Sequence, residues 1–351
     1  MARFYTYLFA VAIAITACNA DKTDTLTATT RLAISPRNRV ELLNRADAQM
    51  AIVTDTITPF FANIGNLDVS LQVGYELPEI PHDSLLRVYR HFLQTHVLGF
   101  SPTEKILVAN TLRKVCAQLA SINSGLFPPL TRCLKTDGAG YGSMTYYTRQ
   151  NCIVIPQLAL QRAAQGDTLQ FERTLAHEIF HLIAHSHSPL RYRAYRCIGF
   201  DTVQHLTLEN PILRDRRIVN PDGTIEVRIR LNDTTFGTLL CYSRPPNFHN
   251  LGNNLFGEHF KSSMFRLRKN GGAWAVETDS LGESTLANTW ETSFFRQVGT
   301  NTEYLIHPEE ILADNFSLLL LQKQGHPLPM PLDSSGVVLL RNFERILRTQ
   351  K

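Results

Sequence analysis

The stretch RTLAHEIFHLIAHSHSP, residues 173–189, decides how the rest of the chain is interpreted. It contains the pentapeptide HEIFH, in which His177 and His181 stand four positions apart. On an α-helix, positions i and i+4 lie one turn apart on the same face, so both imidazoles can reach one ion. Histidines at this spacing bind zinc, and the glutamate between them, here Glu178, is placed as a general base. The stretch therefore predicts a helical zinc site.

The residues around the pentapeptide favour a largely buried helix. Asp167 is suited to be its N-cap, Gln170 stands at the capping-box position, and Pro189 ends the helix. The alternative is a helix whose histidines only satisfy hydrogen bonds in the core. Apolar residues recur at three- and four-residue steps, as expected for a buried face: Leu169, Phe171, Leu175, Ile179, Leu182 and Ile183.

Two histidines leave a catalytic zinc in need of a third protein ligand. Eight residues of helix span about 12 Å, so His185 is too far along to share an ion with His177, and we expect it to be solvated or behind the ligands. His187 stands at the third histidine of the metzincin pattern HExxHxxGxxH. However, Ala184 replaces the turn glycine, and Met264 is only a faint candidate for the Met-turn. This alternative stays open.

The other source is the helical segment HPEEILADNFSLLLLQKQG, residues 307–325. Glu310 and Asp314 again share one helical face at i and i+4. Glu310 can bind the ion, and Asp314 can accept the ring N–H of a ligand histidine. Glu309 is less attractive as a ligand because its i+4 partner is Ala313. The alternative explanation is that the helix dipole alone favours two acids in a first turn.

An HExxH motif followed far downstream by a glutamate four residues before an aspartate resembles the gluzincin metallopeptidases, the thermolysin-like clan. The resemblance covers residues 173–187 and 304–318. The segment GYGSMTYYT adds a likeness to a poorly characterised group of exported bacterial proteins with the same motif. The resemblance implies a role for each motif residue: His177, His181 and Glu310 bind zinc, Glu178 is the base, and Asp314 supports a ligand from behind.

The same resemblance implies a zincin-like α+β core with an active-site helix, a second ligand-bearing helix and a β-rich insertion at about 198–300. Strand-like runs separated by turn sequences support that insertion. Related enzymes stabilise the oxyanion with a Tyr or His near the third ligand, which makes Tyr304 and His307 candidates. Either residue can equally flank or cap the helix. The run NCIVI, residues 151–155, predicts a strand that is either an edge for peptide docking or a fully paired core strand.

The N-terminus predicts export. A basic start and an apolar run of about fifteen residues describe a signal peptide over residues 1–20. Within it, ITAC resembles a bacterial lipobox that would lipidate Cys18 and anchor the protein to a membrane, whereas ordinary cleavage after Ala20 would discard this cysteine. Residues 21–37 read as a flexible tether. We expect a cell-envelope lipoprotein, or else a secreted or periplasmic protein.

Two further regions follow the tether: a mainly helical region at 38–165 and the zinc-binding catalytic region at 166–351. The formal net charge of +4 is mild, and no basic block is interleaved with aromatic residues, which argues against a nucleic-acid partner. The cysteines beyond Cys18 are treated as structural. The sequence thus predicts an exported zinc-dependent peptidase acting on peptides or proteins. The alternative from another class is a non-catalytic envelope protein that keeps zinc for binding or structure.

Overall fold

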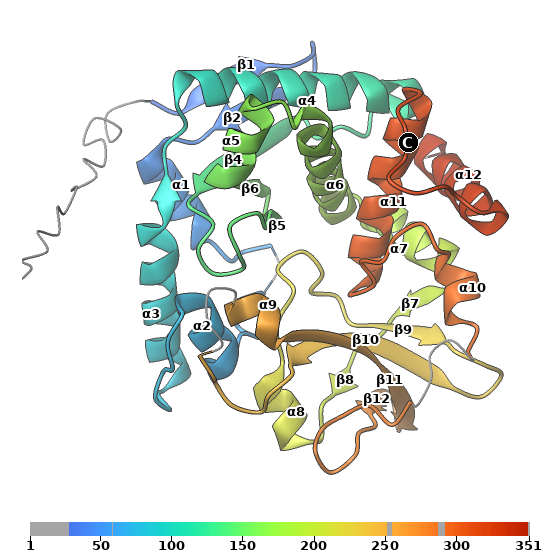
Figure 1. Cartoon of the computed structure of the whole chain (residues 1–351). Helices are drawn as coiled ribbons and strands as arrows, with labels where there is room; N and C mark the ends of the chain where they lie inside the picture. The colour runs from blue at the N-terminus through green and yellow to red at the C-terminus, as the bar shows by residue number, and fades with distance from the viewer. Residues whose placement is uncertain (1–27, 58, 251–254, 287–291, 350–351) are drawn as a thin grey trace, which may run out of the picture.

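The computed structural model describes residues 28–57, 59–250, 255–286 and 292–349, which form a mixed α+β protein with two sheets (Figure 1). The expected α+β class is confirmed. The signal peptide, Cys18 and most of the tether lie outside the described residues. Within the described part of the chain, no helix combines the length and the apolar character that a membrane span requires.

The first sheet has the strand order β1-β2-β4-β6-β5, with β3 paired to β4. Strands β2, β4 and β6 run parallel, and β5 lies antiparallel at the edge. The run NCIVI therefore supplies a fully paired core strand, and its edge-strand interpretation is wrong. Every residue of β6 is buried, as expected for a parallel strand covered on both faces. The bounds are β1 (Thr30–Ala33), β2 (Arg39–Leu42), β3 (Val97–Leu98), β4 (Leu130–Thr136), β5 (Tyr147–Arg149) and β6 (Cys152–Pro156).

Helices α1 to α5 belong to the same part of the chain, so the region at 38–165 combines helices with most of the first sheet. The longest of them begins with a capping box, in which Ser101 and Glu104 exchange hydrogen bonds with each other's backbone. The bounds are α1 (Arg45–Ile52), α2 (Asn66–Val73), α3 (His82–Thr95), α4 (Pro102–Asn123) and α5 (Gln157–Ala164).

The second sheet has the order β7-β9-β10-β11-β12-β8 and lies below the first sheet in Figure 1. Its centre is the long antiparallel pair β10 and β11. Its strands fall inside the segment that the sequence predicted to be rich in β structure. The bounds are β7 (Phe200–Thr202), β8 (Leu206–Thr207), β9 (Val227–Arg230), β10 (Phe236–Ser243), β11 (Phe260–Asn270) and β12 (Ala273–Val276), with α8 (Pro211–Arg216), α9 (Leu255–His259) and α10 (Phe294–Val298) between or after them.

Helix α6 (Thr168–Ser186) packs against α11 (Pro308–Lys323) (Figure 1). These two helices carry the residues that the sequence proposed as metal ligands. Helices α7 (Ser188–Cys197) and α12 (Ser334–Arg348) cover the pair. The fully buried ring of Phe180 lies 5.6 Å, centroid to centroid, from the rings of both Phe316 and Phe343. This aromatic cluster fixes how the two helices approach each other.

The start of α6 differs in detail from the sequence prediction. Asp167 occupies the N-cap position, but its side chain makes no capping hydrogen bond. The Gln170 amide instead donates to the Thr174 hydroxyl at 3.2 Å, so the expected capping box does not form. The cysteines fit a structural role: all five in the described residues are free thiols, and four of them are buried.

Candidate metal centre

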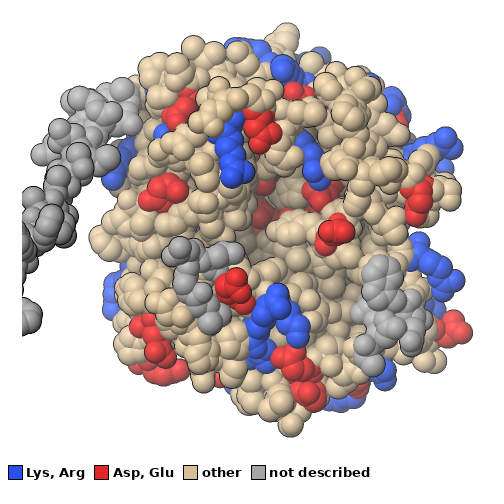
Figure 2. Space-filling model, in the orientation of Figure 1, with Lys and Arg blue, Asp and Glu red and all other residues tan. Residues whose placement is uncertain are grey.

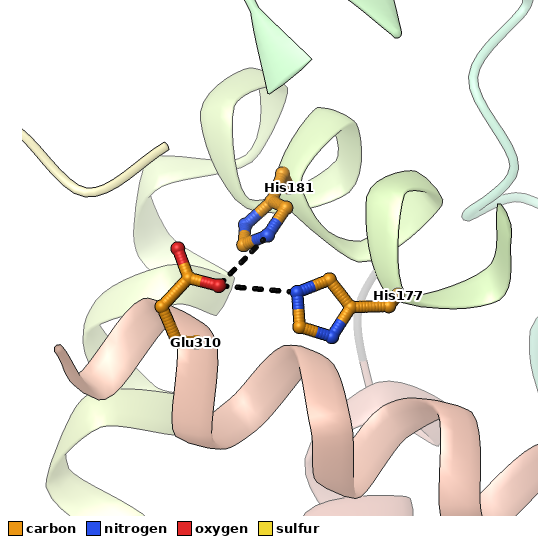
Figure 3. A group of neighbouring side chains, drawn as sticks. All are labelled: His177, His181 and Glu310. Carbon is orange, nitrogen blue, oxygen red and sulfur yellow. Dashed lines mark hydrogen bonds and ion pairs between the residues drawn. The ribbon is translucent and has the colours of Figure 1, made fainter. Parts of the chain in front are cut away.

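Helices α6 and α11 bring His177, His181 and Glu310 together (Figure 3). The Glu310 Oε2 atom lies 3.1 Å from His177 Nε2 and 3.6 Å from His181 Nε2. One candidate ligand atom from each side chain lies within 4.8 Å of the other two. The two segments that the sequence proposed as separate sources of ligands therefore meet at one point.

The surroundings of His181 suit a bound cation. This side chain is 0% exposed, and neither of its ring nitrogens has a hydrogen-bond partner in the described structure. An unpaired polar group buried in this way costs on the order of 1–3 kcal/mol. A cation at the point where His177, His181 and Glu310 converge would remove part of that cost. Two imidazole nitrogens and one carboxylate oxygen are a donor set that zinc accepts.

The ionisation of the cluster also favours a cation. Burial lowers the pKa of His177, but its hydrogen bonds with Asp314 and Glu310 raise it further, to about 9. Burial opposes ionisation of Glu310, but His181 and His177 hold the pKa of this carboxyl well below its usual range. Glu310 is therefore an anion at neutral pH, as a metal ligand must be.

Asp314 lies where the sequence predicted it. Its Oδ1 atom is 3.0 Å from His177 Nδ1, so the carboxylate can accept the hydrogen on that nitrogen. Its other oxygen accepts a hydrogen bond from the Thr302 hydroxyl. When a cation replaces the proton on Nε2, the neutral ring keeps its hydrogen on Nδ1, toward Asp314, and the Nε2 lone pair faces the ion.

Glu309, which sequence reasoning set aside, lies behind the other histidine. It is almost fully buried, and its Oε1 atom lies 3.7 Å from His181 Nδ1. Its Oε2 atom accepts a hydrogen bond from the hydroxyl of Tyr195 on α7. Each histidine of the cluster therefore faces Glu310 with Nε2 and a second carboxylate with Nδ1. The Glu-Glu doublet was visible in the sequence, but its first member was considered only as a ligand.

Glu178 lies beside the cluster, buried and held by one hydroxyl. Its Oε2 atom accepts a hydrogen bond of 2.8 Å from Thr148 on β5. The backbone N–H of Thr148 donates to Asp222, a buried carboxylate that with Glu178 and His181 forms a second potential ligand group. Burial raises the pKa of both carboxyl groups. Thr148 ends the segment GYGSMTYYT that the sequence singled out, whereas no sequence motif pointed to Asp222.

A polar cavity of about 230 Å³ opens onto this site. Figure 2 shows the hollow in the face of the molecule, with acidic side chains in its floor. Tyr304 lines the cavity with 44% of its surface exposed, and its ring centroid lies 6.3 Å from that of His177. A second, more apolar cavity of about 200 Å³ adjoins the first, since four residues line both: Thr145, Tyr146, Asp222 and Tyr304.

His307 lies away from this cavity, which corrects its assignment as an oxyanion donor. Its Nδ1 atom accepts the backbone N–H of Glu309 at 3.1 Å, and its Nε2 atom lies 3.0 Å from the carbonyl oxygen of Ile225. Burial lowers its pKa, which keeps the ring neutral. Both nitrogens are occupied, so His307 is the N-cap of α11, the alternative that the sequence left open.

The structure does not support the metzincin alternative. Helix α6 continues through Ala184 to Ser186, so the chain makes no turn that would carry His187 back to the cluster. His187 instead joins α6 to α7, and its Nδ1 atom lies 3.2 Å from the Ser186 hydroxyl. Met264 is a buried core residue of β11.

His185 lies behind the cluster, one of the two positions expected for it. Its Nε2 atom lies 3.1 Å from the carbonyl oxygen of Asp222, and burial lowers its pKa.

Comparison with known proteins adds no relative: no family model matches the chain, and neither a curated protein nor a solved structure matches it.

Proposed function

We propose that this protein is a zinc-dependent hydrolase with a zincin-like core, and that it cleaves peptide bonds. The observation that carries the proposal is the convergence of His177, His181 and Glu310 around a fully buried imidazole without hydrogen-bond partners. These three residues would hold the ion. Zinc bound there would supply a Lewis acid that polarises a carbonyl group and acidifies water.

An accessible side of the cluster favours catalysis over a purely structural site. Structural zinc sites are closed by four protein ligands, whereas catalytic sites keep a position for substrate or water. His177 and Glu310 both line the cavity that opens beside them. The rival, a non-catalytic envelope protein with a closed zinc site, would require a fourth ligand, for which Asp222, a buried carboxylate within 4.8 Å of His181, is a candidate.

Glu178 would act as the general base. The Thr148 hydroxyl occupies Glu178 Oε2, which leaves Oε1 to accept a proton from the attacking water. Burial raises the pKa of this carboxyl, which makes it a stronger base than an exposed glutamate. A structural site has no use for such a group beside the ion.

Tyr304 would stabilise the oxyanion of the tetrahedral intermediate. Its ring stands in the cavity wall beside His177. A tyrosine hydroxyl is protonated at neutral pH, so it can donate a hydrogen bond to the oxyanion.

Export, and attachment to the cell envelope through a lipid on Cys18, are proposed on the N-terminal sequence alone. In that location the enzyme would meet exported proteins and peptides as substrates.

The test is peptide hydrolysis by zinc-loaded wild-type protein and by Glu178→Gln. The variant should keep its zinc and lose activity by about 10²- to 10⁴-fold, the usual contribution of a general base. The exposed Glu79 provides the matched control, and Glu79→Gln should match the wild type in both measurements. Equal hydrolysis by wild type and Glu178→Gln would contradict the proposal.

A further inference from the structure

Arg173 stands in the wall of the cavity that opens onto the cluster. It lies one turn of α6 before His177, and 23% of its side-chain surface is exposed. Among the described residues that line this cavity, it is the sole lysine or arginine. Arg173 has no role in the zinc chemistry proposed above.

The guanidinium group of Arg173 has hydrogen-bond donors to spare. Its sole ion pair in the described structure places its NH2 nitrogen 3.7 Å from Asp314 Oδ1, which is too long for a hydrogen bond. Asp314 is already satisfied by His177 and Thr302. An arginine presents five N–H donors in a rigid planar fork, so the group can still bind a planar anion through two parallel hydrogen bonds.

The remaining charges of the cavity wall restrict where such an anion can lie. Apart from one histidine and two tyrosines, the other ionisable side chains that line it are acidic: Glu178, Asp222, Glu310 and Asp314. Like charges repel a carboxylate from their vicinity. Arg173 is therefore the point in this wall where an anionic group is favoured, and bidentate pairing with a carboxylate gives that point geometric selectivity.

We propose that Arg173 binds a carboxylate of the substrate and so selects which bond is cut. The inference rests on the proposed peptidase function. Four residues of helix separate Arg173 from His177 by about 6 Å along the axis, and one extended residue spans about 3.5 Å. The bound carboxylate then lies within about two residues of the scissile bond. It is either the C-terminal carboxylate or the side chain of an Asp or Glu.

A peptide library of mixed sequence provides the test. Half of it is left untreated, and in the other half all carboxyl groups are converted to amides. Zinc-loaded wild-type protein should cut bonds near a carboxylate in the untreated half, and amidation should slow cleavage of the same bonds by at least about tenfold, because hydrogen bonds to charged groups contribute that much. Clustering of cut sites near C-termini, or near Asp and Glu, identifies the source of the carboxylate.

The variants separate selection from a structural role. Arg173→Gln should cut the untreated and the amidated halves at equal rates. Arg173→Lys should keep part of the difference. The exposed Arg113 on α4 supplies the control, since Arg113→Gln should behave as wild type. Zinc content is measured for every variant. A general loss of activity or zinc in Arg173→Gln would overturn the proposal.

Capture of peptides gives a readout that does not depend on hydrolysis. Immobilised, zinc-loaded Glu178→Gln protein should retain untreated peptides in preference to amidated ones. The double variant that carries both Glu178→Gln and Arg173→Gln should show no such preference. Failure of wild-type protein to cut either half contradicts the peptidase function, while capture still decides the role of Arg173. Equal cleavage and equal capture of both halves would overturn the role of Arg173 and leave the peptidase function standing.

Discussion

The hydroxyl of Thr148 lies 2.8 Å from Oε2 of Glu178 and connects the edge strand of the first sheet to the centre of α6. Thr148 is fully buried, and its backbone N–H is bonded to Asp222. One residue therefore fixes the position of the proposed base and of the carboxylate beside it.

Thr148→Val should lower kcat for peptide hydrolysis by about 10- to 100-fold, since a hydrogen bond to a charged group contributes roughly 1.5–3 kcal/mol. The Thr148 hydroxyl lowers the pKa of Glu178, so its removal should move the acidic limb of the kcat/KM profile to higher pH. Thr148→Ser retains the hydroxyl and is the control. An unchanged profile in Thr148→Val would show that this hydroxyl does not hold the base.

Glu309→Gln should weaken zinc binding by about 10- to 100-fold, the usual effect of losing a carboxylate behind a ligand histidine. The carboxylate faces His181 Nδ1 at 3.7 Å, and the Tyr195 hydroxyl holds its other oxygen. Competition with a chelator measures the zinc affinity. Glu79→Gln, on the surface, should bind zinc as the wild type does. Wild-type affinity in Glu309→Gln would remove Glu309 from the site.

Phe180→Ala should lower the free energy of unfolding by about 3–5 kcal/mol, as expected for removing a fully buried aromatic ring. The loss should be accompanied by weaker zinc binding, because Phe180 packs α6 against Phe316 of α11 and these helices carry the ligands. Urea unfolding measures the change. Leu169→Ala, at an exposed position of the same helix, should cost much less. Equal losses in the two variants would contradict the packing argument.

The metal-free protein should become less stable as pH rises from about 6.5 to 9. Hydrogen bonds with Asp314 and Glu310 outweigh burial and raise the pKa of His177 to about 9, above the ordinary histidine value of 6.5. A raised histidine pKa stabilises the fold below the unfolded value, and that contribution is lost as pH passes the folded value. Zinc affinity should rise over the same range, because the ligand must be neutral.

Thermal unfolding of metal-free protein across this pH range gives the first measurement, and zinc titration gives the second. The pKa of His181 is raised as well, so His177→Gln removes one of two such histidines and should weaken the dependence of stability on pH. A melting temperature of the wild-type protein that stays level or rises between pH 6.5 and 9 would contradict the assigned charge of the cluster.

The sequence was sufficient for the residues that lie on one helical face. His177, His181, Glu310 and Asp314 could be named because the i, i+4 spacing fixes their direction locally, without knowledge of the rest of the fold. The α+β class and the β-rich segment followed from periodicity and turn residues in the same way. That α6 meets α11 was an expectation from the resemblance, since spacing within one helix says nothing of a second helix.

The residues that were missed act through contacts between distant segments. Thr148 and Glu178 are separated by 30 positions, and Tyr195 and Glu309 by 114, so no periodic pattern relates them. His307 was misassigned because a capping residue and an oxyanion donor occupy the same position in sequence and differ only in where the ring points. The paired position of β6 depends on strand order, which the run NCIVI does not contain.

Diffraction from zinc-loaded crystals at the zinc absorption edge tests the central claim most directly, because the anomalous signal locates the ion and identifies its ligands. We predict a single zinc with Nε2 of His177, Nε2 of His181 and a carboxylate oxygen of Glu310 at about 2.0–2.2 Å, and with a remaining position facing the cavity. An ion bound elsewhere, or a fourth ligand such as Asp222 closing the site, would contradict the account.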